Sequence, residues 1–554
     1  MNKRLLFKGT IICCLFFATS SKFFAQEYTS DVRVLVGSIP IPFAICTNLS
    51  TNETSVSDAN GILNLPFRNP TDTLEFRSLG FETRLIMPSE KIKREIRLNE
   101  NPVGIDAVLI TSNISPAQVQ NEGLKGIEQL EVVSVVSSKP PGKSTDLLMN
   151  TGQVMVQQSQ QGGGSPIIRG FEANRILLVV DGVRMNNAIY RSGHLQNAIT
   201  VDPNSLERVQ VIMGPSSVKY GSDALGGVIH FQTHRPRFRR DDSEKKWDGD
   251  VSLQTMTNNS SNIIHARIEG GAEKWATLFS VSDSEFGDVR MGENRMHGDD
   301  HWGLMNQYVQ SEWGEDEVIE NEDPNLQVGT GYDQLDLMHK LRFAIPGGAL
   351  QTNVQYSTSS FISRFDRIND LSDGNPKWAE WYYGPQNRFL SSLSWEQFLG
   401  IPGSLHTTVA YQKIKESRHR RKLGEEYTSS QYEDLDVMSL NSIWRSSPNK
   451  RSDWDFEVGI DVQWNEVEST AESTSDTIQV ATRYANDGSK MLNLGAFASA
   501  KKTKGAKVLH AGIRYNYSSL DANFDLTQSP FSALKFNNIS MSNGALTGSF
   551  GYEI

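Results

Sequence analysis

The chain holds few side chains whose types and spacing could carry out a reaction. Ten histidines are spread over 554 residues, and Cys46 is the only cysteine beyond the N-terminal apolar run. No nucleophile beside a base and no metal spacing such as His-x-x-Glu stands out. Asp58 and Asp72 could suggest a cation site, but Asp58 begins Asp-Ala-Asn-Gly, a sequence that favours a turn. The sequence therefore predicts neither an enzyme nor a resident metal.

Residues suited to recognition are more evident, first in the segment from Asn101 to Ser115. Its centre is a short apolar run of strand-forming residues, and Pro102 and Gly104 keep it out of a regular element. Such a segment can add a strand to the exposed sheet edge of a partner, where backbone hydrogen bonds give affinity. The alternative is a linker or a first strand of the next domain. The candidate partner-binding residues are Asp106, Ala107, Val108, Leu109, Ile110 and Thr111.

A second recognition candidate is a group of aromatic residues between Phe361 and Asn387, a long polar stretch expected to be a loop. Trp378, Trp381 and Tyr382 lie in this stretch. Aromatic rings in a surface loop could contact a ligand, because binding residues are often carried on loops. Rings of the same kind could equally anchor the loop by packing. Both interpretations stay open.

The elements that position these residues are centred on the segment from Ile167 to Thr233. Ile176 to Val180 is a continuous apolar run that ends in Asp-Gly, and Arg208 to Met213 alternates before a Gly-Pro pair. Glycines and small residues between Tyr220 and Gly227 favour tight turns rather than a helix interior. Val228 to Thr233 predicts another strand. The segment is therefore expected to form a compact α/β unit.

The ordered short motifs of this segment resemble the plug domain of TonB-dependent outer-membrane receptors. Ile-Arg-Gly, Val-Asp-Gly-Val-Arg, Glu-Arg-Val-x-Val, Gly-Pro, Tyr-Gly and Gly-Gly-Val-Ile follow one another in the family's order. Gln210 and Met213 stand where the family commonly has a glutamate and an arginine, so any ion pairs to the barrel made by those residues would be missing. The motif residues are Arg169, Gly170, Asp181, Gly182, Arg184, Glu207, Arg208, Gly214, Pro215, Tyr220, Gly221, Gly226 and Gly227.

The N-terminal region predicts export and a small β-domain. Basic residues precede an apolar run from Ile11 to Ala18, which is typical of a secretory signal peptide over residues 1–25. From 27 to 100, short alternating runs separated by turn residues favour a small antiparallel β-sandwich. This region resembles the carboxypeptidase regulatory-like domain that precedes the plug in many such receptors. We interpret it as a structural or docking domain without peptidase activity.

Residues 247–554 consist of long alternating segments. In Trp454 to Trp464 apolar and polar residues alternate strictly, which suits a strand with one face toward lipid and the other toward water. The mean hydropathy of -0.41 does not oppose this interpretation, because only every second residue of a barrel strand meets lipid. Roughly 12 such segments occur, against ~22 strands in plugged transporters. A partial barrel is therefore expected.

These patterns predict a mostly β protein: a small β-sandwich, an α/β plug domain and an antiparallel transmembrane β-barrel that is apparently truncated. With the resemblance, the chain divides into residues 27–100 for the sandwich, 101–115 for a TonB-box linker, 116–236 for the plug and 247–554 for the barrel. The resemblance implies a receptor in the outer membrane that takes up a scarce solute. Its partners would be a TonB-type energy-coupling protein, outer-membrane lipid and a small-molecule ligand, and no nucleic acid. A surface adhesin, a signalling receptor and a glycan importer of the same architecture are the alternatives.

The resemblance also suggests a ligand. Arg191 to Asn197, followed by Asp202-Pro203, is similar to the plug of haem and haemoglobin receptors, where a histidine in an apical loop helps hold the iron. The alignment leaves His194 one place from that histidine. Imidazole is a suitable axial ligand for haem iron, and a loop position would leave it accessible. No cofactor is expected. Haem or a ferric siderophore is the candidate cargo, with His194 and Arg191 as candidate ligand-binding residues.

Overall fold

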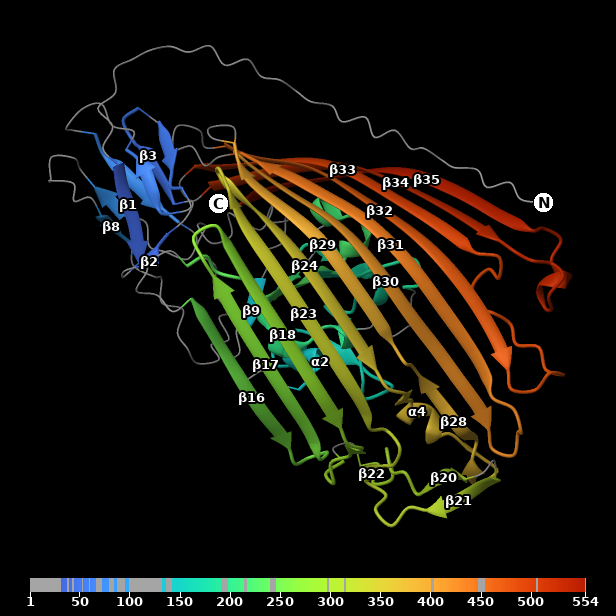
Figure 1. The fold of residues 1–554 in the computed structure, drawn as a ribbon. Helices are drawn as coiled ribbons and strands as arrows, with labels where there is room; N and C mark the ends of the chain where they lie inside the picture. Colours follow the sequence, from blue (N-terminus) through green and yellow to red (C-terminus); the bar gives the residue numbers. More distant parts are fainter. Residues whose placement is uncertain are drawn as a thin grey trace, which may run out of the picture.

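The computed structural model arranges the chain as three units: a pair of small sheets, a central α/β domain and a large curved sheet (Figure 1). The fold class expected from the sequence is confirmed. None of the helices within the described residues is both long and apolar enough to cross a membrane. The described residues are 31–36, 39–41, 44–51, 53–58, 60–65, 72–78, 84–86, 95–98, 132–135, 142–190, 198–213, 217–239, 246–295, 298–312, 315–399, 403–446, 454–504 and 507–553.

The two small sheets, within residues 31–98, share one hydrophobic core that includes the fully buried Cys46 and Phe76. Side chains alternate between the core and the outside, as expected for short strands that have one covered face. One sheet has the order β2-β1-β5 with β8 beside β1, and the other has the order β4-β3-β6-β7. The strands are β1 (Asp31–Val36), β2 (Ile39–Pro40), β3 (Ile45–Asn48), β4 (Thr54–Val56), β5 (Ile62–Asn64), β6 (Leu74–Arg77), β7 (Arg84–Ile86) and β8 (Glu95–Arg97).

Asp58 and Asp72 act as hydrogen-bond acceptors in this unit. Asp58 Oδ1 accepts from the backbone N–H groups of Asn60 and Ile62 at 2.7 and 2.8 Å, which makes it the turn residue that its sequence predicted. Asp72 Oδ2 accepts from Asn48 Nδ2 at 2.7 Å. Throughout the described ranges, no group of three or more His, Cys, Asp or Glu side chains is placed to hold a metal ion.

The central domain, residues 142–239 with β9, is built on a five-stranded sheet in the order β13-β12-β15-β14-β9. All five residues of β12 (Ile176–Val180) are buried, because apolar clusters cover both faces of this strand. β12 pairs in parallel with β15, and β15 pairs antiparallel with β14. The other elements are β9 (Val132–Val135), α2 (Ser144–Met149), β10 (Met155–Gln157), β11 (Ser165–Ile167), η1 (Ala173–Arg175), β13 (Val183–Arg184), η2 (Ala198–Thr200), η3 (Pro203–Ser205), β14 (Leu206–Met213), α3 (Ser217–Tyr220), η4 (Ser222–Ala224) and β15 (Gly227–Thr233).

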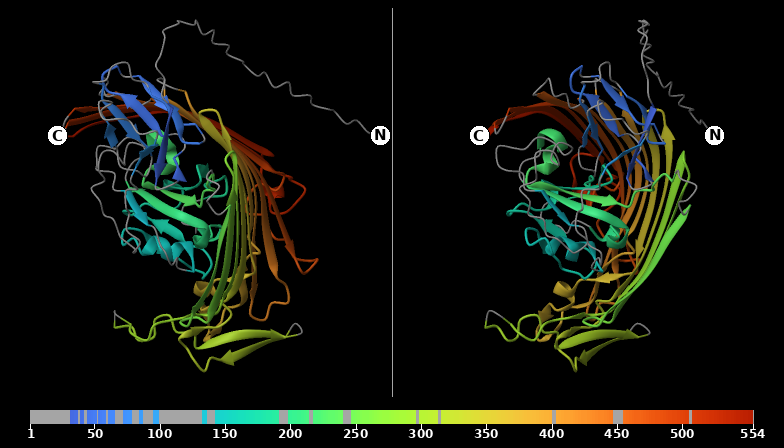
Figure 2. Two further views of the ribbon diagram at one scale, coloured as in Figure 1. Left: turned by 60° about the vertical axis from the view of Figure 1, so that its left-hand side comes forward. Right: turned by 90° about the vertical axis from the view of Figure 1, so that its left-hand side faces the viewer.

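The large sheet, called the wall below, is antiparallel along its main path and follows the chain order, with β16 and β35 at the two ends of the path. It curves around the central domain, which lies on its concave side (Figure 2). The strands of the path are β16 (Trp247–Met256), β17 (Ser261–Gly271), β18 (Trp275–Phe286), β23 (Tyr332–Ile345), β24 (Gly348–Ser359), β29 (Asn387–Phe398), β30 (Ser404–Lys422), β31 (Ser429–Arg445), β32 (Trp454–Ser473), β33 (Ser489–Lys504), β34 (Lys507–Asn523) and β35 (Asn538–Glu553).

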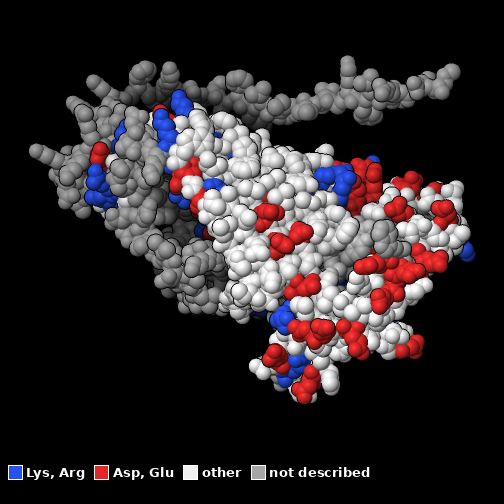
Figure 3. Space-filling model, turned by 60° about the horizontal axis from the view of Figure 1, so that its bottom comes forward, with Lys and Arg blue, Asp and Glu red and all other residues white. Residues whose placement is uncertain are grey.

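The apolar and polar residues of β32 lie on opposite faces of the wall, as their alternation in the sequence predicted. Its apolar residues, such as Phe456 and Ile460, are exposed on the convex face, and Glu457 and Gln463 are buried on the concave face. Figure 3 shows a convex face with wide areas free of charge and acidic side chains gathered toward the long loops. β32 is 20 residues long, twice the predicted length. The alternation of apolar and polar residues ends at Trp464, but the backbone of β32 stays paired with β31 as far as Ser473.

The long loops are more regular than the sequence predicted. The stretch from Ser282 to Tyr332 begins inside β18 and then forms the hairpin of β20 (Gln307–Glu312) and β21 (Glu315–Glu320), beside the short pair β19 (Val289–Arg290) and β22 (Leu326–Gln327). The stretch from Phe361 to Asn387 contains β25 (Ile362–Ser363), α4 (Phe365–Ile368), β26 (Leu371–Ser372), β27 (Asn375–Pro376) and β28 (Trp378–Tyr383). β28 pairs with the end of β30, so it belongs to the wall.

Candidate functional site at the contact between the central domain and the wall

Asp181 is the most strongly held motif residue at this contact. It forms the two-residue turn between β12 and β13 with Gly182, and both have positive φ angles, 48° and 86°. Such a turn favours Asp-Gly, because glycine adopts positive φ without steric cost. The turn aims the Asp181 carboxylate at the wall, where Oδ2 accepts from Lys340 Nζ and from Asn353 Nδ2, each at 2.9 Å. Asp181 therefore joins the central domain to β23 and β24.

The electrostatic surroundings keep Asp181 ionised. Burial alone would raise the pKa of this carboxyl, but the charge of Lys340 and the hydrogen bonds from Thr233 outweigh burial and hold the pKa below its ordinary value. Thr233 contributes both its backbone N–H, at 2.9 Å, and its hydroxyl. Lys340 is itself fully buried. The pair is therefore a desolvated ion pair whose hydrogen bonds are satisfied from both units.

A second ionic contact joins the central domain to β32. Lys219 Nζ lies 3.0 Å from Glu457 Oε1, and Arg184 Nη1 lies 3.8 Å from Asp461 Oδ1. Asp461 also pairs with Arg514 of β34 at 2.8 Å. These two acidic residues belong to the polar face of β32, which the sequence predicted to face away from lipid. Their partners on the central domain, Lys219 and Arg184, lie more than 200 positions earlier in the chain.

Arg184 has a role inside the domain as well. Its Nη2 lies 2.8 Å from Asp223 Oδ2, and its Nη1 donates to the carbonyl of Tyr220 at 2.7 Å. The arginine therefore ties β13 to the turn that begins at Tyr220. Gly221 in that turn has a φ of 88°, and a Cβ there would lie 3.1 Å from Arg514 Nη2. A glycine at this place lets the turn approach the wall.

The remaining motif residues shape the domain rather than the contact. Gly170 and Arg169 form a turn with positive φ. A Cβ on Gly226 would overlap Phe171, and a Cβ on Gly227 would lie 2.5 Å from the carbonyl oxygen of Ile212. These glycines permit close backbone packing. Glu207 is exposed, Arg208 donates to Gln232, and Gly214 and Pro215 lie outside the described residues.

Gln210 and Met213, the two residues that depart from the family pattern, are buried inside the domain. Gln210 is buried and accepts a hydrogen bond from Gln232 Nε2 at 3.0 Å. Met213 is buried in the apolar core of the domain. Both side chains are thus used inside the domain, and the ionic contacts to the wall are made by other residues, among them Asp181, Arg184 and Lys219.

The segment 186–190 carries the contact toward the long loops of the wall. Gln463 Nε2 donates to the carbonyl of Asn186 at 2.8 Å, and the hydroxyl of Tyr484 donates to the carbonyl of Ile189 at 3.0 Å. Ile189 also packs in an apolar cluster with side chains of β30, β31 and β32. Arg191 and His194, which follow in the chain, lie outside the described residues. So do the six residues from Asp106 to Thr111.

The aromatic candidates lie on a strand, which corrects the loop expected for them. Trp381 of β28 is buried, and the Arg364 guanidinium lies over its ring at 4.5 Å. Tyr382 stacks on His419 with ring centroids 4.7 Å apart. Among the described residues, the ring contacts of Trp378, Trp381 and Tyr382 are all to residues of the same stretch, 361–383, or to β30. Trp381 therefore has the surroundings of a packed anchor.

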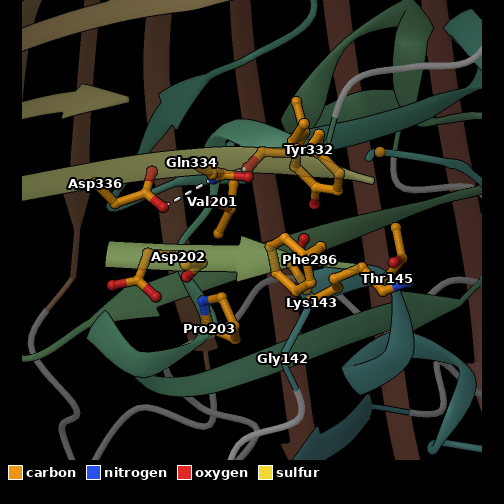
Figure 4. A pocket seen from close by; sticks show the side chains of 14 residues that line it. Gly142, Lys143, Thr145, Val201, Asp202, Pro203, Phe286, Tyr332, Gln334 and Asp336 are labelled. Atoms are coloured by element: carbon orange, nitrogen blue, oxygen red, sulfur yellow. Dashed lines mark hydrogen bonds between the residues drawn. The ribbon is translucent and has the colours of Figure 1, made fainter. Parts of the chain in front are cut away.

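A small cavity lies between the central domain and strands β18 and β23, with a volume of about 20 Å³ (Figure 4). Asp202 and Pro203 line it from the domain, and Gln334 and Asp336 line it from the wall. A cavity of this size has room for about one water molecule. Its lining includes two buried carboxylates from the two units.

Comparison with known proteins identifies the central domain. Residues 128–228 match the TonB-dependent Receptor Plug Domain family. The chain therefore carries a TonB-dependent receptor plug. The resemblance stated from the sequence motifs is confirmed for this domain, which is called the plug below.

Two relatives match the chain over a limited number of residues. The chain is 36% identical over 108 residues to a hemin receptor of Yersinia enterocolitica, which is 18% of this chain and 15% of that protein. It is 46% identical over 82 residues to a vitamin B12 transporter of Vibrio vulnificus, which is 14% of this chain and 13% of that protein. The chain thus spans less than a sixth of the length of these two relatives.

Among solved structures, the fold is similar to that of a copper transporter, with a TM-score of 0.57, 13% identity, and coverage of 77% of this chain and 61% of that chain. A hemophore receptor of Serratia marcescens gives a TM-score of 0.53 and 16% identity, with coverage of 77% of this chain and 60% of that chain. The matched proteins are receptors and transporters rather than enzymes. The plug and the wall together identify an outer-membrane protein.

Proposed function

We propose that the protein is an outer-membrane receptor that actively takes up a scarce solute, with energy supplied by a TonB-type partner. The observation that carries this proposal is the plug bound to the concave face of the wall through Asp181–Lys340 and Lys219–Glu457. A plug held in this way blocks the space that the wall surrounds. Passage of a solute then needs work to displace the plug, because buried ion pairs must be separated.

The segment Asp106 to Thr111 is the proposed site at which that work is applied. It combines strand-forming residues with a preceding Pro102 and Gly104, and it lies just before the plug in the sequence. Strand addition to a partner's sheet edge would transmit force along the backbone, since backbone hydrogen bonds hold such complexes together. The partner class is therefore a periplasmic coupling protein with an open sheet edge.

The test is a pair of substitutions at Leu109 in the membrane-assembled protein. Leu109→Pro removes a backbone donor and distorts an added strand, so ligand binding should persist while uptake is lost. Leu109→Val is the matched control, because it keeps the backbone donor and the strand preference, and uptake should be retained. Normal uptake by the proline variant would refute the coupling role. Uptake that persists without any TonB partner would refute the proposed function.

An iron complex, haem or a ferric siderophore, is the proposed cargo. The support is the likeness of the plug to hemin receptors of two Yersinia species and to an iron-regulated outer membrane virulence protein of Vibrio cholerae. His194 and Arg191 are the proposed contacts on the plug side. They follow the segment 186–190, which lies next to the long loops of the wall.

A further inference from the structure

Two buried carboxylates from different units meet at the cavity between the plug and the wall (Figure 4). Asp202 caps η3 of the plug, where its Oδ1 accepts from the backbone N–H of Asn204 at 2.9 Å. Asp336 is an inward-facing residue of β23. Only 7% of Asp202 and 8% of Asp336 is exposed. The two groups are close enough to interact electrostatically across the cavity.

Neutral groups supply the hydrogen bonds of both carboxylates. Asp202 Oδ2 accepts from the hydroxyl of Ser282 at 2.7 Å, and Asp336 Oδ2 accepts from Gln334 Nε2 at 2.8 Å. Ser357 of β24 donates to Asp336 as well. Within the described part of the chain, no lysine or arginine forms an ion pair with either carboxylate. This arrangement differs from that of Asp181, whose charge is matched by Lys340.

His265 on β17 is a further titratable group that acts on Asp202. It reaches that carboxylate through Ser282, whose hydroxyl lies 2.8 Å from His265 Nδ1. Two further charges act on the imidazole: Asp250 of β16 favours a positive charge there, and Arg267 of β17 disfavours it. His265 is therefore no direct counter-ion, because a hydroxyl separates it from the carboxylate.

The other ionisable groups around the cavity belong to α2 and β23. Lys143, just before α2, and Tyr332, on β23, line the cavity. The charge of Lys143 favours the ionised form of Asp146 of α2. Asp146 in turn interacts with Tyr332. Within the described residues, neither Lys143 nor His265 forms an ion pair with Asp202 or Asp336.

Two like charges in a shared desolvated site cannot both be maintained, so one of the groups keeps a proton. Burial acts in the same direction and raises the pKa of Asp202. We propose that Asp202 and Asp336 form a proton-binding site shared by the plug and the wall, and that seating of the plug takes up one proton. The space for one water between the groups allows the proton to be shared directly or through that water.

The proposal makes the plug contact sensitive to pH in a defined direction. At this site the seated state binds more protons than the separated state, so the contribution of the site to stability is fully present below the ordinary carboxyl range and is lost as the pH rises through the raised pKa of Asp202. Displacement of the plug would separate the carboxylates and release the proton. This holds whatever solute the protein carries.

Infrared spectroscopy of the membrane-assembled full chain tests the site. At neutral pH the wild-type protein should show the C=O stretching band of a protonated carboxylic acid. Asp202→Asn and Asp336→Asn should each remove that band, whereas His265→Gln should leave it in place. A wild-type spectrum without the band at neutral pH would overturn the proposal, and so would a band that survives in both asparagine variants.

The pH dependence of thermal unfolding gives an independent measurement. Wild-type protein should lose thermal stability between mildly acidic and alkaline pH, and Asp336→Asn should flatten this loss. Asp333→Asn is the matched control, because Asp333 lies on the same strand with an exposed side chain. It should follow the wild-type curve. Identical curves for wild type and Asp336→Asn would contradict the shared site.

Discussion

The Asp181 carboxylate, on the turn between β12 and β13 of the plug, lies 2.9 Å from the ammonium group of Lys340 on β23. The first residue belongs to a motif that the sequence displays, and the second is one of many residues at alternating positions of a wall strand. Their ion pair holds the turn between β12 and β13 of the plug against β23 of the wall. It also makes the contact measurable by substitution.

Lys340→Met is expected to destabilise the protein strongly, because it leaves the Asp181 carboxylate buried and unpaired. Breaking a buried ion pair by removing one partner costs roughly 3–5 kcal/mol. The double variant Asp181→Asn with Lys340→Met should recover much of that loss, since it buries no charge. Denaturant unfolding measures both, with Glu285→Gln on the exposed side of β18 as control. Equal losses in the single and the double variant would argue against a coupled pair.

Acidification should weaken the contact at Asp181. The pKa of this carboxyl is held below its ordinary value, so its contribution is fully present above that ordinary value and is lost as the pH falls through the lowered one. Thermal unfolding followed from neutral to acidic pH should therefore fall more steeply for wild type than for Asp181→Asn. If the thermal stability of Asp181→Asn fell with pH as steeply as that of wild type, groups other than Asp181 would be responsible for the loss of stability in acid.

Gly495→Ala should disturb plug seating from within the wall. A Cβ at this position would overlap the Arg514 guanidinium and lie 2.5 Å from Asp461 Oδ2, so the pair that faces Arg184 would have to move. Overpacking of this kind costs ~1–3 kcal/mol. Gly548→Ala is the control, because a Cβ there meets nothing nearer than 3.4 Å. Protease resistance of the plug should fall in the first variant only, and equal resistance would remove Gly495 from the contact.

Haem should shift its Soret band on binding to the membrane-assembled receptor, and His194→Ala should weaken that shift. The reason is the affinity of an accessible imidazole for haem iron. His301→Ala, at another loop histidine, serves as the control and should bind as wild type. An unchanged spectrum and affinity for His194→Ala would exclude this histidine, and a receptor that binds no haem would favour a ferric siderophore.

The sequence was most informative where a residue's role depends on near neighbours. The Asp-Gly turn at Asp181 and the two faces of β32 follow from local patterns, and the structure has them as predicted. The same alternation marks Glu457 and Asp461 as inward-facing, but it cannot indicate that Lys219 and Arg184 lie opposite, because that depends on how a distant sheet closes around the plug. The loop predicted for Trp381 was wrong for a similar reason. β28 is a strand because β30 extends far enough to pair with it and because β25 pairs with it as well.

Cys46, buried in the N-terminal unit, provides a local reporter of mechanical opening. Burial, with Glu75 nearby, raises the pKa of its thiol, and the thiolate is the form that alkylating reagents attack. The folded unit should therefore resist labelling, and any force that pulls it apart should make the thiol reactive. The proposed coupling segment from Asp106 to Thr111 follows this unit directly. The labelling rate in actively transporting cells would thus report whether tension applied to that segment also spreads backwards into the domain that precedes it.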